Sequence, residues 1–277
     1  MRRGPAPPVD TVASRPLAII SGGGSGIGLA AALRLGRAGC RVALLSRDAH
    51  KLAQAQHAMA AEGIEVVVQA LDVRDRATCA DVVSNLCAEH GAPLWLVTSA
   101  GIVEPGFFLE QDPALAAAQM DTNFHGTLNL VHAGVPPMVA AGRGHVVMVA
   151  SSAGLFGVAG YSGYCASKFA VRGFAEVLRI ELARTGVSVT VAVPPDTDTP
   201  QLAYESRLRP AAIAPFAGAG TPLSPDRVAA HMIRTAERGG FLSAPTADLA
   251  AIARLQGLAG GVLARVQMRL LRRPAKR

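Results

Sequence analysis

A tyrosine and a lysine four residues apart are the side chains in this sequence best suited to proton transfer. Tyr164 and Lys168 fall in residues 161–185, whose pattern predicts a helix, so both point to one face of it. A free tyrosine has a pKa of about 10, and an ammonium one helical turn away stabilises the tyrosinate and lowers that pKa. The pair could then give a proton to a carbonyl oxygen as hydride arrives. Because the spacing is common, two exposed side chains on an amphipathic helix are the alternative.

Two serines precede this pair. Residues 145–150 predict a buried strand, and Ser151 follows that strand, thirteen residues before Tyr164. This separation allows a loop to bring the Ser151 hydroxyl beside the phenol. Ser152 takes the same place if the register differs by one residue.

A glycine-rich loop, residues 21–28 (SGGGSGIG), lies between a short apolar segment and a helical pattern that ends at Ala38. Missing side chains let the backbone approach a diphosphate, and a helix N-terminus supplies N–H donors and partial positive charge. We therefore predict dinucleotide binding here, with a turn that merely joins strand and helix as the alternative. The residues expected to contact the cofactor in this loop are Gly22, Gly24, Ser25, Gly26 and Ile27.

The next two predicted strands end in residues that could select the cofactor. Arg47 follows the strand at residues 42–45, where an NAD enzyme usually has a carboxylate and an arginine suits a 2′-phosphate. Lys51 lies one helical turn further on, so we predict NADPH, with a solvated arginine and lysine as the alternative. Asp72 and Val73 are expected at the adenine edge, although Asp72 could instead cap the following helix.

These residues sit in one alternating pattern of apolar strands and helices. Strands are predicted at residues 17–20, 42–45, 64–71, 94–98, 145–150 and 187–193. Helices are predicted up to residue 38 and at residues 49–61, 76–90, 113–141 and 161–185, with Pro136 and Pro137 expected to bend or break the fourth. Continuous apolar strands are typical of a parallel sheet buried on both faces. We predict one doubly wound α/β domain with a mostly parallel sheet over residues 16–247, after a flexible N-terminal arm at residues 1–15.

Composition and charge exclude several classes of protein. Half of the 277 residues are hydrophobic and 17% are charged, which excludes an intrinsically disordered chain. Six basic residues after position 264 account for all but one of the net charge of +7, so no nucleic-acid-binding surface is expected across the fold. The four cysteines have no paired or metal-binding spacing, and neither a signal peptide nor a spanning segment is evident. We expect a cytoplasmic protein with free thiols and no bound metal.

Together these motifs resemble the short-chain dehydrogenase/reductase family over about residues 16–200. The matching positions are the glycine loop, Asp72-Val73, Ala100-Gly101, Asn123, Ser151 and the Tyr164–Lys168 pair. The resemblance implies a Rossmann fold, with cofactor contacts at Ala100 and Gly101 and further contacts from Tyr164 and Lys168. Ser21 and Thr98-Ser99 depart from the usual family residues, and the second change is expected to loosen its loop.

The resemblance also implies a catalytic tetrad. In it Tyr164 is the acid and base, and Lys168 holds the nicotinamide ribose and tunes the tyrosine. Ser151 orients the substrate carbonyl, and Asn123 holds a water in the proton relay.

The segment after the last predicted strand resembles a narrower branch of the family. Residues 194–200 (PPDTDTP) and 165–173 (CASKFAVRG) are similar to the 3-ketodihydrosphingosine reductases of sphingolipid synthesis. This implies that NADPH reduces the 3-keto group of 3-ketodihydrosphingosine, a long-chain keto sphingoid base, to dihydrosphingosine. Side chains then expected near the cofactor are Thr197 and Thr199, and those expected to face the substrate ammonium are Asp196 or Asp198. Turn formation through the neighbouring backbone is the alternative for both aspartates.

Residues 201–225 lie where this family carries its lid. A groove for an acyl chain is expected there, with ordinary loop packing as the alternative. The residues expected to line it are Leu202, Tyr204, Leu208 and Phe216.

Residues 248–273 predict a basic amphipathic helix, and a tail continues to residue 277. Such a helix could lie as a peripheral contact on the cytoplasmic face of an anionic membrane. Contact with a second subunit and packing on the body are the alternatives. The dimers and tetramers of the family favour a homo-oligomer.

Two other functions stay open at this point. A short-chain reductase of another ketone, such as an acyl, steroid or xenobiotic carbonyl, would differ chiefly in its lid. A nucleotide-sensing module without catalysis usually lacks the tyrosine or the lysine, and both are present here.

Overall fold

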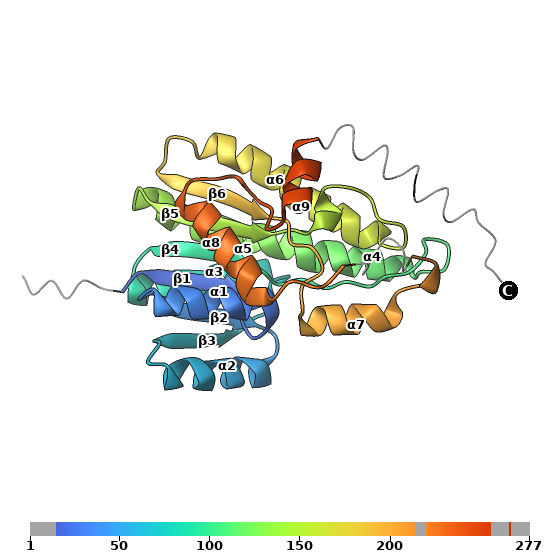
Figure 1. Ribbon diagram of the computed structural model, residues 1–277. Helices are drawn as coiled ribbons and strands as arrows, with labels where there is room; N and C mark the ends of the chain where they lie inside the picture. Colours follow the sequence, from blue (N-terminus) through green and yellow to red (C-terminus); the bar gives the residue numbers. More distant parts are fainter. Residues whose placement is uncertain (1–14, 214–219, 256–265, 267–277) are drawn as a thin grey trace, which may run out of the picture.

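A parallel sheet forms the centre of the fold (Figure 1). The computed structural model describes residues 15–213, 220–255 and 266, and in this part of the chain seven strands pair in the order β3-β2-β1-β4-β5-β6-β7. The strands are β1 (Leu17–Ser21), β2 (Arg41–Ser46), β3 (Val66–Ala70), β4 (Pro93–Thr98), β5 (Gly144–Val149), β6 (Val187–Ala192) and β7 (Leu242–Ser243). The strand order reverses between β1 and β4. In open α/β sheets, ligands bind outside the carboxyl ends of the strands at such a reversal.

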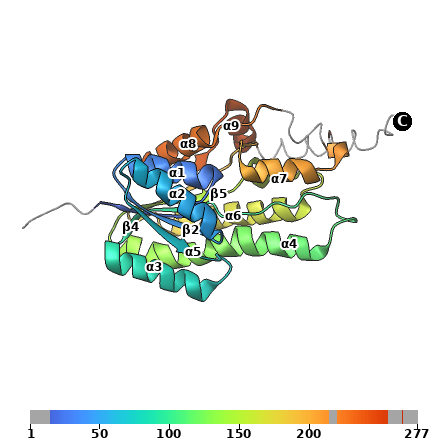
Figure 2. The ribbon, with the colours of Figure 1, turned by 90° about the horizontal axis from the view of Figure 1, so that it is seen from below.

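Helices cover both faces of the sheet, as the continuous apolar strands predict. In β1, Leu17 and Ile19 pack into one core and Ala18 and Ile20 into the other, because alternate residues of a strand face opposite sides. Figure 2 shows α1 and α8 on one side of the strands and α3 and α5 on the other. The helices are α1 (Gly26–Arg37), α2 (Ala49–Ala61), α3 (Arg76–His90), α4 (Pro113–Met120), α5 (Gly126–Ala140), α6 (Ser162–Glu181), α7 (Pro200–Leu208), α8 (Pro225–Glu237) and α9 (Ala247–Arg254). The doubly wound α/β prediction is confirmed.

The segment predicted as one helix over residues 113–141 is helical throughout but contains a π turn. The π turn η1 (Asp121–His125) joins α4 to α5. Pro136 and Pro137 were expected to bend or break this helix, and they do not break it, since α5 runs through both to Ala140. Buried side chains on either side of the prolines hold α5 against the sheet, and this packing outweighs the loss of two backbone donors.

Three elements after β6 were not predicted. Both α7 and α8 carry ordinary start signals, because Thr199 and Ser224 cap them and a proline follows each cap. The strand β7 has only two residues, and it is too short for any periodicity to show. In Figure 1, α7 lies beyond the carboxyl ends of the strands, inside the segment predicted as a lid.

The two ends of the chain fall largely outside the described residues. This applies to the N-terminal arm apart from Arg15 and to the predicted C-terminal helix beyond Leu255 apart from Val266. Phe216, in the segment predicted as a lid, also lies outside the described residues. The membrane contact of that helix and the homo-oligomer therefore stay predictions. Among the helices in the described part of the chain, none is both long and apolar enough to cross a membrane.

Candidate active site

A cavity of about 900 Å³ lies at the carboxyl ends of the central strands, and it brings most of the predicted site residues together. Its size suits a small-molecule ligand. The predicted residues that line it are Gly22, Gly24, Ser25, Gly26, Ile27, Arg47, Lys51, Val73, Ala100, Gly101, Ser151, Ser152, Tyr164, Lys168, Asp196, Thr197 and Thr199. Asp72 and Asn123 do not line it.

The glycine loop forms one end of this cavity. Gly22 has a φ of 66° and Gly26 a φ of 56°, which are left-handed conformations that favour glycine. A Cβ at Gly28 would lie 2.4 Å from the Gly22 carbonyl oxygen, so only a missing side chain allows this turn. Helix α1 begins here, and its N-cap Ser25 makes no side-chain capping hydrogen bond. First-turn N–H groups of α1 are thereby left to an anion such as a diphosphate.

The loop after β4 is held by a hydroxyl of β1. The Ser21 Oγ accepts hydrogen bonds from the backbone N–H of Ser99 at 3.1 Å and of Ala100 at 3.2 Å. A Cβ at Gly22 would lie 2.9 Å from this same backbone. The substitution at Thr98-Ser99 therefore leaves the loop tied to β1.

Ser151 and Tyr164 meet at the other side of the cavity. The Ser151 side chain lowers the pKa of Tyr164 by hydrogen bonding, and the Ser151 Oγ accepts from the Ala153 N–H at 3.1 Å. The turn after Ser151 packs closely on α6, since a Cβ at Gly154 would lie 2.9 Å from the Lys168 carbonyl oxygen. Of the two serines considered, Ser151 is the one whose side chain affects the pKa of the phenol.

Lys168 is buried one turn beyond Tyr164. Its Nζ donates to the Val149 carbonyl at 3.0 Å and lies 5.6 Å from the centroid of the Tyr164 ring. Burial lowers the pKa of Lys168 to about 8. Burial also raises the pKa of Tyr164, while the hydrogen bond with Ser151 lowers it. The expected lowering of the tyrosine pKa by Lys168 is therefore not the dominant effect, and Tyr164 is a neutral phenol that can donate a proton.

Asn123 lies behind the cavity in the π turn. Its Nδ2 donates to the Ile102 carbonyl at 3.0 Å and to the Ser167 Oγ at 2.9 Å, and its Oδ1 accepts from the Ile102 N–H at 2.8 Å. A Cβ at Gly101 would lie 3.1 Å from this Oδ1 and 3.5 Å from the Lys168 Nζ. The side chain thus ties the loop after β4 to α6, close to Lys168, and its role in a water relay stays a prediction.

The charged end of the cavity contains an acid that the sequence analysis did not weigh. Arg47 is exposed, and the Lys51 Nζ lies 3.3 Å from a carboxylate oxygen of Asp48, which also lines the cavity. Asp48 is the N-cap of α2 and accepts from the Lys51 N–H at 3.0 Å. Because Lys51 pairs with Asp48, Arg47 supplies the excess positive charge at this end.

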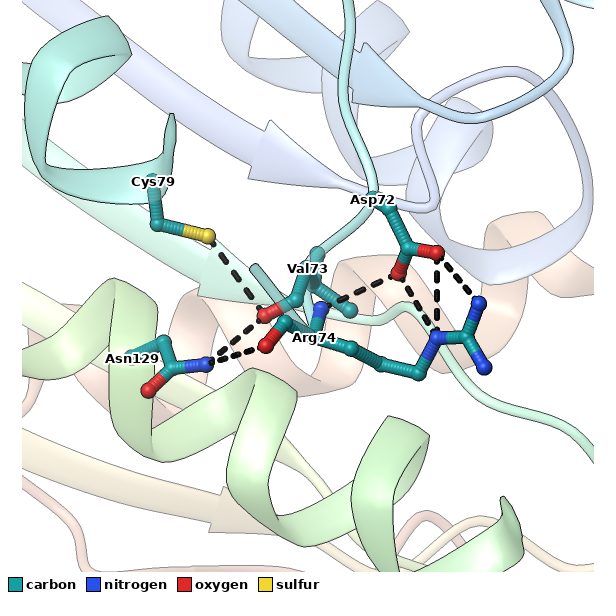
Figure 3. A network of polar contacts seen from close by, with 5 residues as sticks. All are labelled: Asp72, Val73, Arg74, Cys79 and Asn129. Atoms are coloured by element: carbon teal, nitrogen blue, oxygen red, sulfur yellow. Dashed lines mark hydrogen bonds and ion pairs between the residues drawn. The ribbon is translucent and has the colours of Figure 1, made fainter. Parts of the chain in front are cut away.

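Asp72 does not line the main cavity but pairs with Arg74. Its carboxylate accepts from the Arg74 guanidinium (Figure 3). The shortest of these contacts is 2.6 Å. This ion pair holds the pKa of Asp72 below its usual value. Asp75, not Asp72, caps α3 by accepting from the Thr78 N–H at 3.1 Å. The capping alternative for Asp72 is therefore wrong, and of the Asp72-Val73 pair only Val73 lines the main cavity.

The two aspartates after β6 that were expected to face the substrate ammonium lie in different surroundings. Asp196 lines the cavity, while Asp198 is exposed and does not. The Thr197 hydroxyl donates to the Pro195 carbonyl at 2.8 Å, and the Thr199 hydroxyl accepts from the Leu202 N–H at 3.2 Å. Both hydroxyls shape the backbone of this segment at the cavity wall.

The predicted apolar groove forms only in part. Leu202 lines the cavity, but Tyr204 and Leu208 are 41% and 43% exposed and lie outside it. The Tyr204 hydroxyl donates to Glu104 at 2.7 Å, so this side chain is drawn away by a polar partner. The groove prediction is wrong for Tyr204 and Leu208.

A polar network at the α7 end was missed. The Tyr161 hydroxyl donates to the Glu205 Oε1 at 2.6 Å, and Arg209 donates to the same oxygen at 2.7 Å and to the Tyr161 oxygen at 2.9 Å. Tyr161 and Glu205 both line the cavity. Burial raises the pKa of Tyr161, with Glu205 adding to the effect, so its hydroxyl is a neutral donor. The i, i+4 spacing of Glu205 and Arg209 was the one signal in the sequence.

Comparison with known proteins agrees with this geometry. The profile of the short chain dehydrogenase family matches residues 16–208. The chain is 37% identical to a 3-dehydrosphinganine reductase of Arabidopsis thaliana, over 76% of this chain and 63% of that protein. It is 33% identical to the 3-dehydrosphinganine reductase of Danio rerio, over 81% of this chain and 69% of that protein. The chain thus spans less than two thirds of the Arabidopsis relative.

Two solved structures have a similar fold. A short-chain dehydrogenase/reductase of Burkholderia phymatum in complex with NAD superposes with a TM-score of 0.79 at 25% identity, covering 95% of this chain and 98% of that one. A metagenomic short-chain oxidoreductase in complex with NADP gives a TM-score of 0.68 at 28% identity, covering 82% and 94%.

Proposed function

Because the chain belongs to the short-chain dehydrogenase family, we propose that it is an NADPH-dependent oxidoreductase that reduces the 3-keto group of 3-ketodihydrosphingosine to dihydrosphingosine. The observation that carries this proposal is that Ser151, Tyr164 and the buried Lys168 line the same cavity as the glycine loop. The names of the relatives from Arabidopsis thaliana and Danio rerio support the substrate.

The residues at the glycine-loop end fit a nicotinamide dinucleotide. Gly22 and Gly28 allow an approach that a Cβ would fill, and the N-terminus of α1 lies beside it. Arg47 lines the cavity, and an arginine after this strand suits a 2′-phosphate, which supports NADPH over NADH. The solved neighbours bound to NADP and to NAD support the cofactor class. When bound, the nicotinamide supplies the hydride.

The side chains of the protein supply the proton. Tyr164 donates its phenolic hydrogen to the carbonyl oxygen as that oxygen gains negative charge. Ser151 is oriented by the Ala153 N–H and fixes the position of the phenol. Lys168 carries an ammonium below a pH of about 8, and its positive charge stabilises the developing tyrosinate.

The test is the oxidation of NADPH by the purified protein with 3-ketodihydrosphingosine, with dihydrosphingosine identified by mass spectrometry. We expect Tyr164→Phe to lower kcat by about 10²–10⁴-fold, the usual size of general acid catalysis. Tyr204→Phe is the matched control, since it removes the same atom from an exposed side chain outside the cavity.

Two outcomes would contradict the proposal. If the folded wild-type protein yields no dihydrosphingosine, the substrate is wrong. If Tyr164→Phe reduces the ketone as fast as Tyr204→Phe, then Tyr164 is not the acid.

A further inference from the structure

We propose that Glu205, with Asp196 beside it, is the specificity-determining group that binds a protonated amine next to the substrate carbonyl. The protein would then prefer α-amino ketones to ketones without an amine. The inference deepens the proposed function and rests on it, because 3-ketodihydrosphingosine carries its amine on the carbon beside the keto group.

Glu205 is held in place through one of its two carboxylate oxygens. Its Oε1 accepts from Tyr161 at 2.6 Å and from Arg209 at 2.7 Å. Among the described residues, none donates a hydrogen bond to its Oε2. The Glu205 side chain is 13% exposed and lines the cavity, so one carboxylate oxygen is left for a donor that enters there.

The charges at this end do not balance without a ligand. The Arg209 guanidinium, itself 10% exposed, lies 3.6 Å from an Asp196 carboxylate oxygen as well as 2.7 Å from Glu205. One cation thus serves two carboxylates, of which Glu205 is 13% and Asp196 34% exposed, and this leaves one excess negative charge that is only partly solvated. The Lys168 ammonium is bound to the Val149 carbonyl and makes no ion pair with either acid in the described part of the chain. A buried excess charge is unfavourable, and a ligand cation would neutralise it.

These carboxylates are also close enough to the acid to act on one substrate. The rings of Tyr161 and Tyr164 have centroids 6.2 Å apart, and the Tyr161 hydroxyl is the one bound to Glu205. Both Glu205 and Asp196 add to the raised pKa of Tyr164, although burial is the larger cause. A carbonyl at the Tyr164 phenol therefore places an amine on the adjacent carbon within the field of both carboxylates.

The experiment compares kcat/KM for matched ketones with and without the amine. One pair is 3-ketodihydrosphingosine and its 2-desamino analogue, and the other is a short α-amino ketone and its desamino counterpart. Glu205→Gln keeps the size of the side chain and an oxygen for Tyr161, but removes the charge. We expect the preference for the amine to fall by about tenfold to a hundredfold, the worth of a hydrogen bond to a charged group.

Two further variants keep the test decisive. The first is Asp196→Asn, which removes the charge of Asp196. The Asp196 carboxylate contacts Arg209 only through the 3.6 Å ion pair, so the substitution breaks no side-chain hydrogen bond with Arg209. We expect it to lower the same preference by a smaller factor with an unchanged Tm. Asp198→Asn is the matched control, because this exposed aspartate two residues away does not line the cavity.

The outcomes separate this inference from the proposed function. If Glu205→Gln and Asp196→Asn slow the amino and desamino ketones equally, their role is structural and the inference is wrong. If the wild type does not reduce 3-ketodihydrosphingosine, yet prefers the short α-amino ketone and loses that preference in Glu205→Gln, the proposed substrate fails and the amine site stands.

Discussion

The two ends of the cavity are built from different parts of the chain. At the glycine-loop end the wall is backbone, and a Cβ at Gly22 or Gly28 would lie 2.9 or 2.4 Å from other backbone atoms. At the α7 end the wall consists of side chains, with Tyr161, Glu205 and Arg209 joined by hydrogen bonds of 2.6 to 2.9 Å. Substitutions can alter the second wall one residue at a time, whereas the first depends on the path of the chain. The fold therefore provides the cofactor end directly and leaves the substrate end to individual residues.

The largest effect is expected from adding a single methyl group to the backbone wall. Gly22→Ala forces a side chain into a φ of 66° and to 2.9 Å from the loop after β4. We expect NADPH binding to weaken by about a hundredfold, or about 3 kcal/mol, because the glycine loop must move away from its position at the diphosphate. The Kd is measured by NADPH fluorescence.

Gly39→Ala is the matched control for this change. Gly39 also has a positive φ, of 93°, but a Cβ there meets nothing within 4 Å, and the residue does not line the cavity. It should lose stability without losing NADPH affinity. Equal affinity losses in the two variants would show that backbone strain, not the shape of the cradle, controls binding.

A second prediction concerns the buried lysine between the two ends. Burial lowers the pKa of Lys168 from 10.5 to about 8. Between these values the unfolded chain holds a proton that the folded chain has released, so the free energy of unfolding rises with pH. Relative to Lys168→Met, the wild type should gain about 3 kcal/mol as the pH rises through this interval.

Urea denaturation at a series of pH values measures this gain. Lys51→Met is the control, since Lys51 is exposed and its substitution should leave the pH dependence unchanged. If Lys168→Met keeps the full pH dependence of the wild type, the folded-state ammonium is not destabilised by burial.

The same contrast explains what the sequence could predict. Tyr164, Lys168 and the glycine loop are defined by spacing within one helix or one turn, so their positions follow from local structure. Whether Lys168 lowers the pKa of Tyr164 could not be predicted, because burial of both groups is a property of the packed fold. The parallel sheet with helices on both faces followed from the continuous apolar character of its strands, while the two-residue β7 had no pattern to detect.

Side chains whose partners lie far away in the sequence were the main failures. Tyr161 and Glu205 are 44 residues apart, and nothing in either segment indicates that they meet. Tyr204 has the apolar character expected of a groove, but its hydroxyl is satisfied by Glu104, 100 residues away. Asp72 is a failure of another kind, because its partner Arg74 is only two residues away and pairs with its carboxylate.

A third, smaller effect is expected at the side-chain wall. Tyr161→Phe removes the hydroxyl that donates to Glu205 at 2.6 Å and accepts from Arg209 at 2.9 Å. We expect a loss of about 1–2 kcal/mol in the free energy of unfolding and a severalfold rise in the KM for the ketone. The KM for NADPH should stay the same, because this residue belongs to the other end of the cavity. A parallel rise in both KM values would mean that the two ends are not independent.

The last effect is expected at Arg47, a side chain at the cofactor end of the cavity. Arg47 is exposed, so water and salt screen its charge, and Arg47→Ala should weaken NADPH binding by only about tenfold, near 1.4 kcal/mol. NADH lacks the 2′-phosphate, and its Kd should not change. Arg37→Ala removes the same charge from an arginine that pairs with Glu62 outside the cavity, and it should alter neither Kd. If Arg47→Ala weakens NADPH and NADH alike, Arg47 does not contact a 2′-phosphate, and the cofactor end recognises the dinucleotide through its backbone alone.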